Sequence, residues 1–202
     1  MTHSLVARPL VAANTNSAVE ESSDPRFRKI LDIEFLVPDS YCPVLAVQSF
    51  INTQIALSRP GAFHHPHDFS DHACARVSRA LKPGEELHLQ VFQDAGALAI
   101  SYEDRMVFLR RHKALLVGAQ GLCLTYPTIM RTFKGRHEGV AFPNISCIVT
   151  LDERERLPVL GDGRPQVPAL WSNHSVTHLN LFEPDLIPLD VFMLCVQRAN
   201  TC

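Results

Sequence analysis

The sequence predicts an α+β fold, a single domain in which a mostly antiparallel sheet packs against a few helices. Apolar residues recur at every second position in several stretches, as in half-buried strands, and at helical spacing in others. The longest alternating stretch, residues 86–109, contains turn residues and therefore predicts an antiparallel meander. With 202 residues, 46% of them hydrophobic, the chain is long enough for one domain with a substantial core.

The amino-terminal part predicts a tail followed by a strand. Residues 1–23 are rich in small polar residues and lack periodic apolar positions, so they cannot bury enough apolar area to offset the entropy of ordering. We expect a disordered N-terminal tail there and the single domain over residues 24–202. The segment "ILDIEFLV" alternates apolar and polar residues between positions 31 and 37 and predicts a strand.

Helical spacing and helix-end residues predict two helices and one interruption. A helix over about 43–58 has a proline where a first turn tolerates it and ends before Pro-Gly. A second helix is expected over 73–81, so the histidine-rich residues 63–72 would link two helices. Glycines and Pro127 argue against one continuous helix over 113–133 and predict a break, with a short helix restarting at the proline.

The remaining strands are expected from alternation and turn residues. Residues 86–109 predict a strand, an Asp-Ala-Gly turn, a second strand, and a third strand after Glu103-Asp104. Further strands are expected near 145–151 and 174–182, around the tight-turn sequence "LGDGRP", with a last buried element in "PLDVFMLCVQ".

Cysteine usage and hydropathy indicate a cytoplasmic protein. The six cysteines show no CxxC pair or repeated spacing, so neither a zinc ribbon nor a disulfide scaffold is predicted. They lie at positions 42, 74, 123, 147, 195 and 202. No continuous apolar stretch approaches the ~20 residues of a membrane span, so we expect no membrane partner.

The segment "FHHPHDFSDH", residues 63–72, has two interpretations. The first is structural: Asp68 or Ser70 caps the following helix, the histidines are solvated, and no cofactor is needed. The alternative is a site for a divalent transition metal such as zinc, because imidazole and carboxylate groups are its usual ligands. Its ligands would be His65, His67, Asp68 and His72.

A pseudo-repeat places two histidines at equivalent positions of predicted strands. "LHLQVF" carries His88 and "THLNLF" carries His178, each on the same face as the residue two positions later. The pattern resembles the two-histidine phosphoesterases, whose paired histidines act as general acid and base on a phosphodiester. Gln90 and Asn180 stand here where those enzymes have hydroxyl residues.

Charge is distributed unevenly although the formal net charge is only −2. Between residues 105 and 137 all charged side chains are basic, and aromatic residues lie among them, which suits phosphate contact with base stacking. These basic residues are Arg105, Arg110, Arg111, Lys113, Arg131, Lys134 and Arg136. The segment could also face an acidic protein or the chain's own acidic segment between Glu20 and Asp39, or be only a solvated surface.

Two functional hypotheses follow. In the first, the protein is a non-catalytic cytoplasmic binding or regulatory module that recognises an anionic partner through residues 105–137. That partner would be nucleic acid or an acidic protein surface. In the alternative, it is a small phosphodiesterase or nuclease-like hydrolase whose histidines act directly or through a metal. Convergence of the histidines in one cleft would favour the enzyme, and scattered histidines the binding module.

Overall fold

The computed structural model describes residues 24–95, 100–136, 147–161, 163–173, 176–188 and 191–199. Its helices are α1 (Ala46–Leu57), α2 (Tyr102–Arg111) and α3 (Gly118–Arg136), with short 3-10 turns η1 (Pro43–Leu45), η2 (Arg154–Arg156) and η3 (Pro184–Leu186). Its strands are β1 (Phe27–Leu36), β2 (Phe63–His64), β3 (Glu86–Asp94), β4 (Ile148–Val149), β5 (Val159–Leu160), β6 (Arg164–Pro165), β7 (Val167–Asn173), β8 (Val176–Phe182) and β9 (Phe192–Arg198). The predicted tail, residues 1–23, lies outside the described residues and stays a prediction.

Seven of these strands form one sheet in the order β1-β3-β9-β4-β7-β8-β2, and β5 and β6 form a separate pair. β1 pairs antiparallel with β3 over its whole length, from Phe27 opposite Asp94 to Leu36 opposite Glu86. β3 with β9 and β7 with β8 are also antiparallel, whereas the short β2 and β4 add parallel pairs with β8 and β9. The predicted α+β fold with a mostly antiparallel sheet is confirmed.

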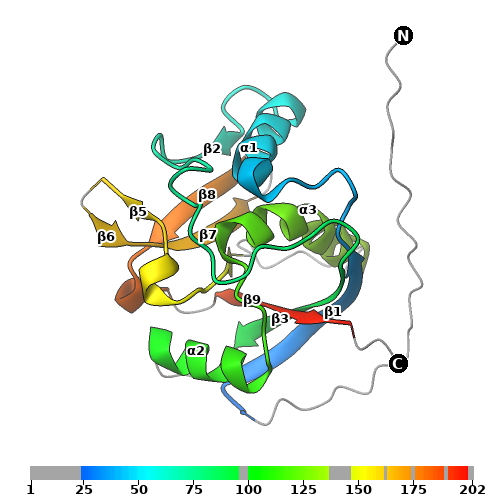
Figure 1. The fold of residues 1–202 in the computed structure, drawn as a ribbon, viewed down its shortest axis with the longest axis vertical. Helices are drawn as coiled ribbons and strands as arrows, with labels where there is room; N and C mark the ends of the chain where they lie inside the picture. Colours follow the sequence, from blue (N-terminus) through cyan, green and yellow to red (C-terminus); the bar gives the residue numbers. More distant parts are fainter. Residues whose placement is uncertain are drawn as a thin grey trace.

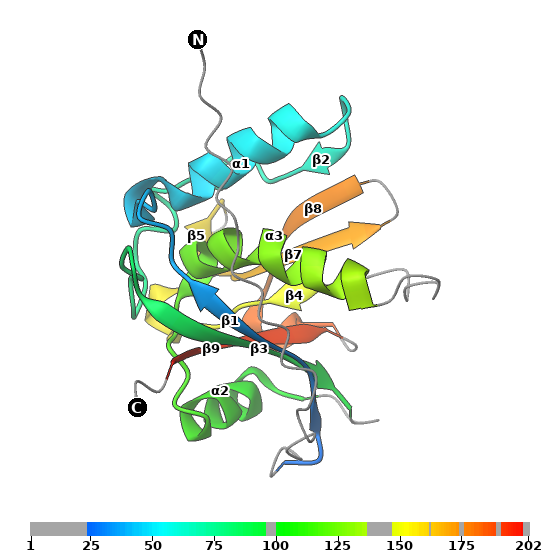
Figure 2. The ribbon, with the colours of Figure 1, turned by 90° about the vertical axis from the view of Figure 1, so that its right-hand side faces the viewer.

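Helices cover both faces of the sheet. In β9, Phe192, Leu194 and Val196 join a core cluster with α1 and α3, whereas Met193 and Cys195 join a second cluster with α2. Because successive side chains of a strand point to opposite faces, α2 packs on the face opposite to α1 and α3. Figures 1 and 2 show this arrangement, with β1, β3 and β9 between α2 and α3.

The chain crosses between the two faces directly after α2. The Leu115 amide donates to the Val196 carbonyl at 2.6 Å and forms an isolated bridge to β9. After this bridge the chain enters α3 on the other face of the sheet. Segments that are continuous in sequence are therefore separated by the full thickness of the sheet.

The predicted strand at 31–37 and the predicted helix at 43–58 are confirmed. The strand is β1, and the helix begins as η1 and continues as α1. α1 buries Val47, Phe50 and Ile51, which share one helical face against the core. The last buried element of the sequence is β9, the strand in which both core clusters meet.

The predicted helix over 73–81 is wrong. This segment forms turns and extended chain because its backbone groups bond to distant parts of the molecule. The Arg79 amide donates to the Leu116 carbonyl at 3.0 Å, and the Ser78 amide donates to the buried Asp152 carboxylate at 3.0 Å. Leu81 is buried but Ala80 is exposed, so the apolar spacing did not mark one buried helical face.

The predicted third strand of the meander is also wrong, because residues 102–111 form α2. Ser101 caps this helix: its hydroxyl accepts from the Asp104 amide at 3.0 Å, and the Asp104 carboxylate accepts from the Ser101 amide at 3.4 Å. The predicted second strand of the meander falls partly on residues 96–99, outside the described residues.

The predicted break in the third helix is wrong as well, because α3 continues through Pro127. Pro127 is exposed, while Leu122, Tyr126, Ile129 and Phe133 form a buried stripe at helical spacing. An interior proline costs about 3 kcal/mol of helix stability, and burial of several large side chains offsets it.

Strands near 145–151 and 174–182 are confirmed as β4 and β8, although β4 is much shorter than expected. β7, which pairs with β8, was not predicted from the sequence. No helix in the described part of the chain is long and apolar enough to cross a membrane.

Candidate anion-binding surface

The carboxyl end of α2 carries the basic sequence "RRHK", residues 110–113. The helix closes in a Schellman motif: the Lys113 amide donates to the Arg110 carbonyl at 3.0 Å, and the Ala114 amide donates to the Leu109 carbonyl at 2.9 Å. The motif needs a left-handed residue, commonly glycine, after the helix. Lys113 occupies this position with a φ of 52°, and it is the one described non-glycine residue with positive φ.

Arg111 and Lys113 are both exposed, and we call these two residues the cationic end of α2. Neither forms a salt bridge with a described residue. Asp24 lies near enough for its pKa to be affected: the hydrogen bond from Arg26 is the main cause that lowers it, and the charge of Arg111 contributes. The cationic end of α2 therefore lies beside the start of the described chain.

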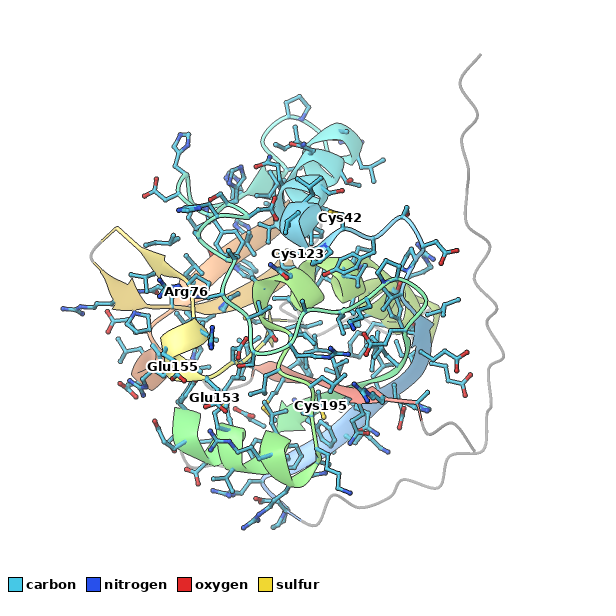
Figure 3. The ribbon with its side chains drawn as sticks, viewed as in Figure 1. Cys42, Arg76, Cys123, Glu153, Glu155 and Cys195 are labelled. Atoms are coloured by element: carbon cyan, nitrogen blue, oxygen red, sulfur yellow. The ribbon has the colours of Figure 1, made fainter. Side chains whose placement is uncertain are left out.

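Arg110 points to a different neighbour. Its Nη2 donates to both carboxylate oxygens of Glu153, at 2.8 and 3.0 Å, and this hydrogen bonding raises the pKa of Arg110. Glu153 and Glu155 lie at the η2 turn beside α2 (Figure 3). A groove runs between this turn and the helix, and its walls carry Glu103 and Arg154, joined at 3.1 Å. Arg110 is thus already paired within the molecule.

His112 fixes the end of α2 to the sheet. Its ring centroid lies 4.0 Å from that of Phe108 and 5.4 Å from that of Phe92. Its Nδ1 lies 3.0 Å from the Phe108 carbonyl oxygen, and its own carbonyl accepts a hydrogen bond from Gln197 on β9. These contacts hold Arg111 and Lys113 on a rigid support.

Arg105 does not belong to any surface, and this corrects its inclusion in the partner-binding set. Its side chain is only 1% exposed, and its Nη2 pairs with the Asp94 carboxylate at 2.5 Å. Its Nη1 also donates to the Ile100 carbonyl at 2.6 Å. Arg105 thereby links α2 to Asp94 on β3.

The other basic residues lie on α3, across the sheet from α2. Arg131 is exposed, and the side chains of Lys134 and Arg136 fall outside the described part of the structure. Because the two helices occupy opposite faces and Arg105 is buried, the basic side chains that the structure describes in this segment do not form one surface. The cationic end of α2 is the part whose members lie together.

His88 and His178 lie far apart. β3 and β8 are separated by β9, β4 and β7, which corresponds to four strand spacings, or roughly 19 Å at ~4.8 Å each. His88 Nδ1 is 3.7 Å from Asp32 Oδ1, and Asp32 also accepts from Gln90 at 3.0 Å and pairs with Lys29 at 3.1 Å. His178 stacks on Trp171. The two histidines do not share a cleft.

The histidine-rich segment, residues 63–72, is held by its other residues. Phe69 is buried in the core, and the Asp71 carboxylate accepts hydrogen bonds from the Val47 and Gln48 amides at 2.9 and 3.1 Å. Asp71 thereby caps α1, which precedes it in the sequence. Asp68 or Ser70 was the predicted cap of the following helix; Ser70 accepts from the Ala73 amide at 3.3 Å, but residues 73–81 form no helix.

The four predicted metal ligands lie in this segment without forming a site. His67, Asp68 and His72 are exposed, and His65 Nδ1 lies 3.0 Å from the Pro66 carbonyl oxygen. Within the described residues, no three His, Cys, Asp or Glu side chains are grouped so that they could hold a metal ion.

Comparison with protein-family models, with curated protein sequences and with solved structures gave no match. The positions and contacts of the side chains are therefore the basis for the function proposed below. The sequence identified Arg111 and Lys113 but not the left-handed backbone of Lys113, because the segment between Glu103-Asp104 and residue 109 was predicted as a strand. A helix prediction for this segment would have placed "RRHK" at a helix end, where a left-handed residue is common.

Proposed function

We propose that the protein is a non-catalytic binding or regulatory module that recognises an anionic partner through the cationic end of α2. The observation that carries this proposal is the position of Lys113, an exposed lysine in a left-handed conformation next to the exposed Arg111. The partner is nucleic acid or an acidic protein surface, since both present the anionic groups that such side chains attract.

The energetics support a role beyond stability. A left-handed conformation costs an L-residue about 1–2 kcal/mol, which glycine avoids. A cation at an exposed helix carboxyl end stabilises the helix by about 0.3–1 kcal/mol. Lysine at position 113 is thus no better than glycine for the stability of the fold, and strained residues of this kind often occur at functional sites.

The alternative, a phosphodiesterase or nuclease-like hydrolase, gains no support from the geometry. General acid–base catalysis needs two groups within reach of one substrate, and His88 and His178 lie on strands separated by three others. A cytoplasmic location forms part of the proposal. The described cysteines, one exposed and four buried, are all free, which suits a reducing compartment.

A salt titration tests this function. The Arg111→Gln/Lys113→Gln double variant is compared with the wild type for binding to a short DNA single strand, a DNA duplex and poly-L-glutamate. The matched control is Arg59→Gln/Arg131→Gln, which removes the same charge from exposed residues of the α1 and α3 face. We expect the first variant to lose affinity and the control to bind like the wild type.

The salt dependence identifies the partner class. If nucleic acid is bound, each lost phosphate contact should flatten the slope of log affinity against log salt by about 0.7 for a single strand or 0.9 for a duplex. An acidic protein partner predicts binding to poly-L-glutamate without binding to DNA. No binding to any polyanion at low salt, or equal losses in both variants, would show the proposal to be wrong.

A further inference from the structure

Three aromatic rings stack across three neighbouring strands at the far edge of the sheet. His64 on β2 lies directly opposite His178 on β8, and Trp171 on β7 lies opposite His178 on its other side. The ring centroids of His64 and His178 are 5.0 Å apart with an interplanar angle of 17°. Those of Trp171 and His178 are 3.9 Å apart with an angle of 6°.

This stack is one of a small number of contacts that hold β2 in the sheet. β2 has only two residues, pairs with β8 alone among the described strands, and is flanked by a hydrogen bond from the Thr177 amide to the Ala62 carbonyl at 2.9 Å. On the opposite side, Phe63 contacts Phe50 of α1 at 6.0 Å between ring centroids. The next firmly buried residue along the chain is Phe69.

The stack also brings two titratable groups together. Partial burial lowers the pKa of His178, and the neighbouring His64 lowers it further. The other rings packed around β2 and His178 are Trp171 on β7 and Phe50 on α1, which carry no charge, and His65, a titratable ring that stacks on Phe63 at 5.5 Å between centroids. Among the described residues, no carboxylate forms a salt bridge with either ring.

We propose that the stack of His64, His178 and Trp171 is a pH-sensitive latch that holds residues 58–68 on the sheet edge when both imidazoles are neutral. Protonation of both rings places two positive charges face to face across the β2–β8 pair. The charges repel each other, and residues 58–68 leave β8 while Phe69 and Asp71 keep the rest of the segment in place.

The direction of the pH effect follows from the lowered pKa. The closed stack favours neutral His178, whereas the released state binds a proton near the ordinary pKa of about 6.5. Pairing of β2 is therefore complete above pH 6.5 and weakens as the pH falls below that value. This proposal is independent of the anionic partner, because α2 and β2 lie at different ends of the molecule (Figure 2).

The chain offers two direct reporters of the latch. Trp171 is the single tryptophan of the sequence, so its fluorescence reports the ring that stacks on His178. The Thr177 amide, which donates to the Ala62 carbonyl, reports the pairing of residues 62–64 with β8 by hydrogen exchange. Both are measured between pH 8 and pH 5 on the full chain.

In the wild type, we expect the protection factor of the Thr177 amide to fall several-fold at pH 5, with a change in Trp171 emission at a midpoint below pH 6.5. His64→Gln and His178→Gln each remove one charge and should keep the protection at pH 5. His72→Gln, a change at an exposed histidine of the same segment, should behave like the wild type.

Protection that is equal at pH 8 and pH 5, or that falls equally in the two Gln variants, would overturn the latch. If a Gln variant already loses protection at pH 8, the wild-type protein decides the matter through NMR titration of its histidine rings. Titration of His178 with a midpoint below pH 6.5, in step with the loss of protection at the Thr177 amide, supports the latch. A His178 midpoint at or above pH 6.5 overturns it.

Discussion

At the scale of single residues, Asp71 shows how the histidine-rich segment contributes to the fold. Its carboxylate bonds to two amides in the first turn of α1, where unpaired backbone donors and the positive end of the helix dipole favour an anion. The exposed His67 and His72 make no comparable contact within the described residues. This carboxylate therefore links the segment to α1 through hydrogen bonds, in addition to the ring contact between Phe63 and Phe50.

We expect Asp71→Ala to lower the free energy of unfolding by about 1 kcal/mol, the usual effect of removing a helix cap. His67→Ala and His72→Ala should each change it by less than about 0.5 kcal/mol, as exposed substitutions do. Urea unfolding with an unchanged m-value measures all three. A larger loss in the histidine variants than in Asp71→Ala would mean that the histidines hold the segment.

At the scale of elements, the segment of α2 that follows Glu103-Asp104 was predicted as a strand from the alternation of its residues. Tyr102, Met106 and Leu109 are buried at helical spacing, but a charged residue stands among them on the same face. Arg105 is buried only because Asp94 on β3 supplies the opposite charge. Sequence spacing contains no sign of this contact. The capping box of Ser101 and Asp104 was the local signal for a helix.

At the end of α2, two substitutions of Lys113 distinguish the effect of backbone strain on stability from the effect of the lysine charge on binding. Lys113→Gly should raise the free energy of unfolding by about 0.5–1 kcal/mol, because glycine adopts a positive φ without strain but loses more entropy on folding. Lys113→Gln should leave the strain and give no such gain. Urea unfolding and polyanion binding are measured for both variants.

Both substitutions should weaken polyanion binding to a similar degree, since each removes the same charge. Glycine would then give a more stable protein that binds less well. If Lys113→Gly bound polyanion like the wild type, the lysine side chain would have no role in recognition. If Lys113→Gly lowered stability instead, the strain argument for Lys113 would be incorrect.

At the scale of the whole molecule, the sequence predicted the fold class but not the arrangement that decides the site. Alternating segments such as β1 and β3 indicate strands that are buried on at least one face, which is enough for an α+β prediction. The strand order depends on contacts between distant segments, such as β4 with β7 and β9. The division of the basic segment between two faces follows from the crossing of the chain beside β9 at Leu115, directly after α2.

The candidate site was therefore predicted only in part. Arg111 and Lys113 belonged to the predicted set, but they share a surface with neither Arg105, which is buried, nor Arg131, which lies on α3. The separation of His88 from His178 depends on where β3 and β8 lie in the sheet. A charge or histidine pattern in sequence gives no information on such distances.

The most direct test of the central claim is an NMR titration that follows every backbone amide as a short DNA single strand, or poly-L-glutamate, is added at low salt. The account predicts that the largest shifts occur at residues 110–114 and near Asp24, while residues 129–133 of α3 change little. Raising the salt concentration should reverse these shifts, because the contacts are electrostatic. Largest shifts on α3, or no shift with either polyanion, would contradict recognition through the cationic end of α2.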